Sequence, residues 1–273
     1  MIDYPGTDDL PSDGVPIRQA ATLLLLADRP DLHVLTLRRT TRSTFMADHT
    51  VFPGGALDPE DSDARWPGLV RGLQPGDADD ALGIGPGSLA FWIAAVRETI
   101  EEVGVAVGLG RDLVDHRDDL DNGRVRLCDL VGPAGLDLSG VHPVARWVTP
   151  IGGPKRYDTF FFVAAAPPDA DPMADGAEAV DVDWMRPAEA LDRWRSGGLT
   201  MIGPTISMLE RLAGFGSSAE ALAAAAESNG THRRRTRVTD LKRYPGYEVT
   251  DAREAMGWAW FPPGEGGSGT TAP

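Results

Sequence analysis

The amino-acid sequence predicts an α/β protein, more specifically an α/β/α sandwich in which helices cover both faces of a sheet. Three observations lead to this class. Two strand-like runs are adjacent over residues 20–39, a strong amphipathic helix covers residues 88–105, and further strands and helices follow it. The chain has 273 residues, of which 42% are hydrophobic, so one elaborated domain with a sizeable core is within reach.

The first third of the chain contains an arm, a hairpin, a glycine bend and an irregular stretch. Residues 1–16 are acidic and interrupted by proline, so we expect a flexible arm there. The run "AATLLLLADRPDLHVLTLRR" (20–39) predicts a β-hairpin, because two apolar runs flank a turn-prone Asp-Arg-Pro-Asp. The run "VFPGG" (51–55) predicts a strand that enters a tight loop lying close to another group. Residues 62–89 are rich in glycine and proline and predict an inserted surface loop.

The run "SLAFWIAAVRETIEEVGV" (88–105) is the best helix of the chain. Ser88 is a plausible cap, Ile93, Val96, Ile100 and Val103 form an apolar stripe, and Gly104 stands where a terminating glycine belongs. Strands are expected over residues 142–150, 157–167 and 179–187, and helices over residues 187–198, 204–215 and 218–228. We expect residues 251–273 to be a tail that is partly disordered, because its last part is of low complexity.

The composition narrows the classes of partner. A formal net charge of −15 repels nucleic acid and anionic membranes, so neither is expected as a partner, and an anionic substrate would need metal ions or local arginines. The single cysteine, Cys128, permits no intrachain disulfide. No basic secretory start is present, and the apolar run at residues 20–27 is too short to span a bilayer. We therefore expect a cytoplasmic protein.

The stretch "RETIEEVG" (97–104) concentrates three carboxylates on one helix. Glu98, Glu101 and Glu102 have the spacing i, i+3, i+4 and share a face, while Arg97 precedes Glu101 by four residues and can pair with it. Such carboxylates repel one another unless a cation is present, and hard divalent ions prefer oxygen ligands. The cluster therefore predicts a Mg²⁺ or Mn²⁺ site. A solvated helix face is the alternative for this pattern, but the glycine pair upstream favours the metal site, since it can bring a backbone carbonyl against an ion.

The runs "GGALDPED" (54–61) and "AVRETIEEVGV" (95–105) together resemble the two halves of the Nudix box, G-x5-E-x7-R-E-U-x-E-E-x-G-U, in which U is aliphatic. The second half of the box matches almost throughout. In the first half, Gly54 or Gly55 matches the glycine of the box, and Glu60 or Asp61 matches its glutamate. Thr99 replaces the usual aliphatic residue, and the spacer runs over residues 61–96 instead of seven residues. Such an insertion is familiar in the NUDT19-like (RP2-type) coenzyme A diphosphatase subgroup, which other segments between residues 17 and 212 also resemble.

The resemblance implies a Nudix-type α/β/α sandwich with a mixed sheet over residues 17–250, an insertion at residues 62–89 within the box, and extra C-terminal helices. It implies a metal-dependent diphosphatase that cleaves the pyrophosphate of coenzyme A or acyl-CoA by water attack. The alternatives are a pyrophosphatase for ADP-ribose, NADH or a nucleotide sugar, and a nucleotide-binding module without turnover. The expected partner is thus a nucleotide-diphosphate small molecule; a homodimer stays open, because dimers are common in the family.

The resemblance also assigns roles to residues. Glu98, Glu101 and Glu102 would hold the metals with the Gly54 carbonyl, Arg97 would orient a glutamate, and Glu60 is a weaker candidate ligand. Glu178, in a loop after the box, would be the general base or another ligand, although a solvated loop glutamate fits the pattern equally. The candidate substrate-binding residues are Arg38, Arg39, Arg42, His49, Lys155 and Arg156, with Phe45 and Met46 as candidate lining residues. Because neighbouring strand residues point to opposite faces, at most one of Lys155 and Arg156 should face the substrate.

Overall fold

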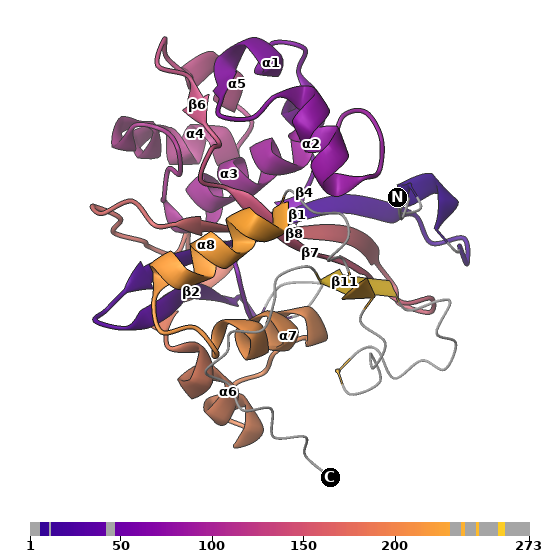
Figure 1. Ribbon diagram of the computed structural model, residues 1–273, viewed down its shortest axis with the longest axis vertical. Coiled ribbons are helices and arrows are strands. Elements are labelled where there is room, and N and C mark those ends of the chain that lie inside the picture. The colour runs from indigo at the N-terminus through magenta and orange to yellow at the C-terminus, as the bar shows by residue number, and fades with distance from the viewer. Residues whose placement is uncertain are drawn as a thin grey trace.

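The computed structural model describes residues 6–10, 12–41, 47–229, 236–237, 244–245 and 256–259. Within these residues one mixed sheet separates two helical layers, with α1 to α5 above it and α6 and α7 below it in the view of Figure 1. The sandwich predicted from the sequence is therefore confirmed. No helix in this part of the chain is long and apolar enough to cross a bilayer.

The sheet is built around β1. The strands are β1 (Ile17–Asp28), β2 (Leu32–Arg39), β3 (Thr50–Val51), β4 (Gly54–Ala56), β7 (His142–Val148), β8 (Arg156–Ala165), β9 (Ala179–Met185), β10 (Thr236–Arg237) and β11 (Met256–Ala259). β1 and β2 form the predicted hairpin, while β8 runs parallel to β1 along its other edge. The first half of β1 also pairs with β4, so the sheet divides there between β4 and β2.

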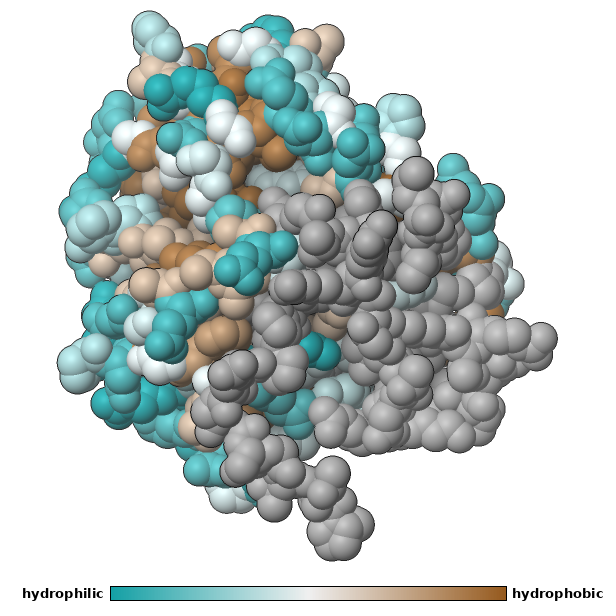
Figure 2. Space-filling model, viewed as in Figure 1, coloured by the Kyte–Doolittle hydropathy of each residue, from teal (hydrophilic) through white to brown (hydrophobic). Residues whose placement is uncertain are grey.

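Alternate side chains of β1 enter two different cores, since successive strand residues point to opposite faces. Leu23 and Leu25 belong to the core under α3 (Leu89–Val103), and Leu24 and Leu26 belong to the core under α6 (Pro187–Arg195), α7 (Gly203–Leu212) and α8 (Ser218–Asn229). The continuous apolar run in the sequence thus marks a strand covered on both faces. On the coloured part of Figure 2, hydrophilic side chains lie along the left and upper rim, and apolar side chains appear among the upper helices and around α8.

The helix α3 lies inside the molecule rather than on its surface. The predicted stripe of Ile93, Val96, Ile100 and Val103 is fully buried, and the helix ends at Gly104, whose φ of 66° suits glycine. Ser88 occupies the N-cap position, but its hydroxyl donates to the Gly85 carbonyl and does not cap the helix. Thr99, which departs from the box, satisfies its hydroxyl on the Ala95 carbonyl at 2.7 Å.

The surface loop that the sequence predicts at residues 62–89 is wrong, because the segment is folded and partly buried. It contains α1 (Trp66–Leu69), β5 (Val70–Arg71) and α2 (Pro75–Leu82), and β5 pairs in parallel with β6 (Leu136–Asp137). Trp66 is 2% exposed and Leu82 fully buried, and both join the core under α3. Beyond the box lie η3 (Arg111–His116), α4 (Arg117–Asp121) and α5 (Leu127–Leu130), and the box acids precede the insertion in η2 (Pro59–Ser62).

Parts of both ends of the domain pack against the sheet. The expected arm contains the short helix η1 (Thr7–Asp9). The Thr7 hydroxyl donates a hydrogen bond to Asp158 Oδ2 at 2.8 Å, and the Leu10 side chain is buried. Asp158 is itself buried in a pair with Arg146, at 2.6 Å between Oδ2 and Nη2. Within the expected tail, β11 pairs with β7 and extends the sheet. The described parts of both ends are therefore packed against the domain.

Candidate active site

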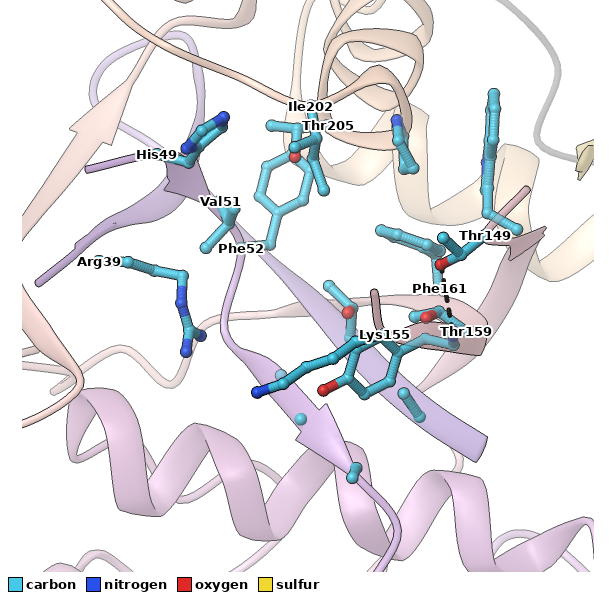
Figure 3. Close-up of a pocket in the computed structure, with 18 of the residues that line it drawn as sticks. Arg39, His49, Val51, Phe52, Thr149, Lys155, Thr159, Phe161, Ile202 and Thr205 are labelled. Carbon is cyan, nitrogen blue, oxygen red and sulfur yellow. Dashed lines mark hydrogen bonds between the residues drawn. The ribbon is translucent and has the colours of Figure 1, made fainter. Parts of the chain in front are cut away.

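A cavity of about 810 Å³ opens on the face of the sheet opposite α3. Its walls come from β1, β7 and β8, from the residues between β3 and β4, and from the beginning of α7. Figure 3 shows Phe52, Ile202 and Thr205 gathered on one side, while the Arg39 and Lys155 side chains extend toward one another from opposite walls. The cavity thus has an apolar side and a cationic side.

Two glycines give α3 access to this cavity, although the helix lies on the other face of the sheet. Glu98 lines the cavity next to Gly54 and Gly55 of β4, which we call the glycine window. A Cβ on Gly55 would lie 2.5 Å from the Glu98 carboxylate, and one on Gly54 would lie 2.6 Å from Thr22 Cα. The missing side chain of Gly55 therefore leaves the space that the Glu98 carboxylate occupies, and that of Gly54 lets β4 lie close to β1.

Arg97 binds together the two halves of the acidic motif. Its side chain is 3% exposed. Its Nε and Nη2 each donate to Asp61 at 3.0 Å, and its Nη1 donates to Glu98 at 2.9 Å and to Glu101 at 2.7 Å. Glu60 lies farther away, with 3.8 Å between Oε1 and Arg97 Nε. The predicted pair of Arg97 and Glu101 is confirmed, and Asp61 is the acid of the first half that closes the motif across the insertion.

Glu102 connects the helix to the glycine window and to a more distant acid. Its Oε2 accepts a hydrogen bond from the Gly54 amide at 2.7 Å, and its Oε1 lies 3.7 Å from Arg39 Nη1. Arg39 also reaches Glu178, whose Oε2 is 3.3 Å from Nη2. Glu178 and Glu98 both line the cavity, whereas Glu101 and Glu102 lie behind it. The structure therefore gathers all four predicted glutamates at one end of the cavity.

Burial makes these carboxyl groups hard to ionise. It raises the pKa of Glu98 to about 7 and that of Glu101 to about 8, although Arg97 lowers both. Burial, and next the charge of Glu98, raise the pKa of Glu102 well above its usual range. Such crowding is relieved by a cation.

The donor set fits a hard divalent cation by chemistry, because it consists of buried carboxylate oxygens beside a backbone loop. Across the residues that the structure describes, no three acidic, histidine or cysteine side chains already converge as metal ligands. The reason lies in the hydrogen bonds given above: Arg97 and the Gly54 amide hold oxygens of all three helix glutamates.

Comparison with known proteins identifies the family. The chain is 30% identical to acyl-coenzyme A diphosphatase NUDT19 of Gallus gallus, in a match covering 73% of this chain and 69% of that protein, and the Homo sapiens protein of the same name gives the same values. The chain belongs to the Nudix hydrolase family. A Nudix hydrolase from Alicyclobacillus acidocaldarius has a similar solved structure, with 29% identity, a TM-score of 0.62, and coverage of 77% of this chain and 97% of that one. The chain matches no protein-family model.

As a Nudix hydrolase, the chain is an enzyme that acts on a phosphoric anhydride. The structure separates its candidate substrate-binding residues into two groups. Arg39, His49 and Lys155 line the cavity. His49 Nδ1 lies 2.9 Å from the Ala47 carbonyl oxygen, which fixes the ring at the cavity wall.

The other candidates do not line the cavity of this Nudix hydrolase. Arg38 is exposed and pairs with Asp48 at 3.1 Å. Arg156 is 1% exposed; its Nε donates to the Thr149 carbonyl at 3.1 Å, and its Nη1 lies 3.6 Å from Asp13. Of the adjacent pair, Lys155 alone is therefore at the cavity, as strand alternation requires. The candidates Arg42, Phe45 and Met46 lie outside the described residues.

Sequence reasoning missed most of the cavity walls of the Nudix hydrolase. Tyr157, Thr159 and Phe161 face the cavity from β8, and their spacing of two residues is a signal that could have found them. Met201 and Ile202, which precede α7, carry no comparable signal, because their place depends on how α7 packs on the sheet.

Proposed function

We propose that this Nudix hydrolase is a metal-dependent diphosphatase that cleaves the pyrophosphate of coenzyme A or acyl-CoA by water attack. The observation that carries the proposal is the reach of Glu98 through the glycine window into a cavity that Arg39 and Lys155 also line. The name of its vertebrate relatives, acyl-coenzyme A diphosphatase, supports the choice of substrate. Mg²⁺ or Mn²⁺ is the proposed cofactor.

Each residue then has a proposed task. Glu98, Glu101 and Glu102, with the Gly54 carbonyl, would hold the metal, which when bound supplies charge neutralisation and water activation. Arg97 restrains Glu98 and Glu101 through the hydrogen bonds described above. Glu178 accepts the proton of the attacking water at a carboxylate oxygen, as expected for a general base at the cavity edge.

The shape and charge of the cavity support a substrate with unlike halves. Its volume of about 810 Å³ lies in the upper part of the usual range for ligand sites. Arg39 and Lys155 offer cations to phosphate oxygens, which the net charge of −15 would otherwise repel. Phe52, Phe161 and Ile202 offer an apolar wall to an organic group. ADP-ribose, NADH and nucleotide sugars share the diphosphate, so the acidic end alone does not choose among them.

Product analysis tests the proposal. The protein is incubated with coenzyme A, an acyl-CoA, ADP-ribose or NADH, with Mg²⁺, Mn²⁺ or a chelator, and the products are resolved. We expect cleavage of coenzyme A into 3′,5′-ADP and 4′-phosphopantetheine, loss of activity with chelator, and a fall of on the order of 100-fold or more in Glu102→Gln. The exposed Glu189→Gln serves as the control and should keep wild-type activity.

Two other results would redirect the assignment. Turnover of ADP-ribose or NADH without turnover of coenzyme A would move the enzyme to another substrate with the same chemistry. No metal-dependent activity in the wild type beyond that of Glu102→Gln would favour the nucleotide-binding module.

A further inference from the structure

Glu178 is positioned by its backbone and by Arg39, whose Nη2 donates a hydrogen bond to the Glu178 Oε2 at 3.3 Å. Its side chain is 62% exposed, so packing does not place it. The connection between β8 and β9 that carries it is held by several hydrogen bonds, among them one from the Thr40 amide to the Glu178 carbonyl at 2.8 Å. Asp175 accepts hydrogen bonds from the amides of Glu178 at 3.0 Å and Ala179 at 2.7 Å, and the Met173 amide donates to the Val103 carbonyl at 3.0 Å. The connection therefore rests on the last turn of α3, the same helix that carries Glu98 and Glu102.

Arg117 stands between these two elements. Its Nε donates to the Glu101 carbonyl at 2.7 Å, and its Nη1 donates to the Met173 carbonyl at 2.9 Å. The Glu101 carbonyl belongs to the last turn of α3, where carbonyls lack helical partners and accept hydrogen bonds from arginine side chains. The carboxylate of Asp175 also attracts Arg117. One guanidinium thus joins the end of the acidic helix to Met173, at the start of the turn over residues 173–179 that carries Glu178.

We propose that Arg117 is a positioning residue, which fixes the Glu178 turn to the C-terminal end of α3 and so sets the place of the Glu178 carboxylate relative to Glu98 and Glu102. The inference rests on the proposed function of Glu178 as the base. Arg117 is not among the residues that line the cavity. It acts through Glu178 alone, so its removal matters only while Glu178 is present.

The chain offers a matched control in Arg111. This residue lies in η3, directly before α4, and its Nη1 donates to the Asp169 carbonyl at 3.0 Å in the same connection. Its side chain is 62% exposed, and its contact lies nine residues before Glu178. Arg111→Ala therefore removes a hydrogen bond of the same kind without touching the turn.

The kinetic test is a double-mutant cycle between Arg117 and Glu178, measured with coenzyme A and Mg²⁺. We expect Arg117→Ala to lower kcat about 10- to 100-fold with KM nearly unchanged, the loss typical of residues that orient a catalytic group. Arg117→Lys should recover part of this loss, since an ammonium can hold one carbonyl but not fork between two. In the Glu178→Gln background, Arg117→Ala should cost less than about twofold. Arg111→Ala should match the wild type.

Hydrogen exchange supplies a readout that is independent of activity. Amides of residues 173–179 should exchange faster in Arg117→Ala than in the wild type, and should be unchanged in Arg111→Ala. Unchanged exchange in Arg117→Ala would overturn the proposal, as would an equal loss of kcat with and without Glu178, which would place the effect of Arg117 on α3 itself. A wild type that cleaves no diphosphate would count against the proposed function, and the exchange result would still decide whether Arg117 fastens the turn.

Discussion

At the residue scale, Gly55 matters because it has no side chain. The Glu98 carboxylate occupies the space that any Cβ at this position would fill. Gly55 has no positive φ, so its backbone would accept alanine, and the constraint comes from the neighbouring carboxylate alone. Gly55 is therefore explained by the neighbouring carboxylate, whereas Gly54 is explained by its close approach to the β1 backbone at Thr22.

Gly55→Ala should displace Glu98 and lower kcat by on the order of 100-fold, the usual cost of moving a reacting group by about 1 Å. Steady-state kinetics with coenzyme A measure the loss, and titration with Mn²⁺ should show weaker binding. Gly76→Ala provides the control, because a Cβ at Gly76 meets nothing within 4 Å. Wild-type kcat in Gly55→Ala would mean that Glu98 does not need the window.

At this same scale, the sequence predicts part of the candidate site. Helical spacing brings Glu98, Glu101 and Glu102 together and pairs Arg97 with Glu101, because these relations are local. Strand alternation predicts that Lys155 and Arg156 diverge, yet not which one meets the cavity, since that depends on how β8 pairs with β1. The choice between Glu60 and Asp61 stayed open for the same reason: the Arg97 contact crosses the whole insertion.

At the scale of elements, the insertion is part of the core. Trp66 packs with the core under α3, and its indole donates to the Glu60 carbonyl at 2.9 Å, next to the Asp61 that binds Arg97. The insertion therefore helps to hold the first half of the motif in place.

Trp66→Ala should lower the free energy of unfolding by about 3–5 kcal/mol, because a large buried aromatic side chain leaves a cavity. Urea unfolding followed by circular dichroism measures the loss. The half-buried Trp194 of α6 offers a comparison, and Trp194→Ala should cost less. A loss within about 0.5 kcal/mol for Trp66→Ala, the range of surface positions, would show that the insertion is peripheral.

Elements were predictable where their signal is local. The β1–β2 hairpin and α3 follow from apolar periodicity and from the glycine that ends the helix. The helices of the insertion could not be predicted because they are short. The burial of Trp66 and Leu82 depends on contacts with residues that are distant in the sequence. The strand β11 could not be predicted for a related reason: it forms by pairing with β7, which lies more than a hundred residues earlier in the sequence.

At the scale of the whole molecule, the acidic cluster should couple folding to protons and, under the proposed function, to cations. The pKa of Glu98 and that of Glu101 rise in the folded protein from a reference value of 4.5 to about 7 and about 8. At a pH between the reference value and the raised pKa values, these two carboxyl groups bind more protons in the folded state than in the unfolded state. The contribution of these two carboxyl groups to the free energy of unfolding therefore falls as the pH rises from about 4.5 to about 8. A divalent cation that binds the ionised carboxylates should restore it.

The melting temperature of the metal-free protein should thus fall between pH 5 and pH 8, and Mg²⁺ should raise it more at pH 8 than at pH 5. At this chain length, each kcal/mol corresponds to about 2–4 °C. Differential scanning calorimetry with and without chelator measures both effects. The double variant Glu98→Gln, Glu102→Gln should lose most of the Mg²⁺ effect, while Glu189→Gln should keep it. An equal Mg²⁺ effect in the double variant would place cation binding elsewhere.

Under the proposed function, the sheet separates the three helix glutamates from the residues that would contact the organic part of the substrate. Glu98, Glu101 and Glu102 belong to a helix on one side, while Ile202, Thr205 and Phe161 face the cavity on the other, and Glu98 reaches that cavity beside the bare backbone of β4. Exchanges on the α7 side should therefore change the choice of substrate while the proposed metal-binding glutamates stay in place. Laboratory evolution toward a new dinucleotide should accumulate its first useful changes there.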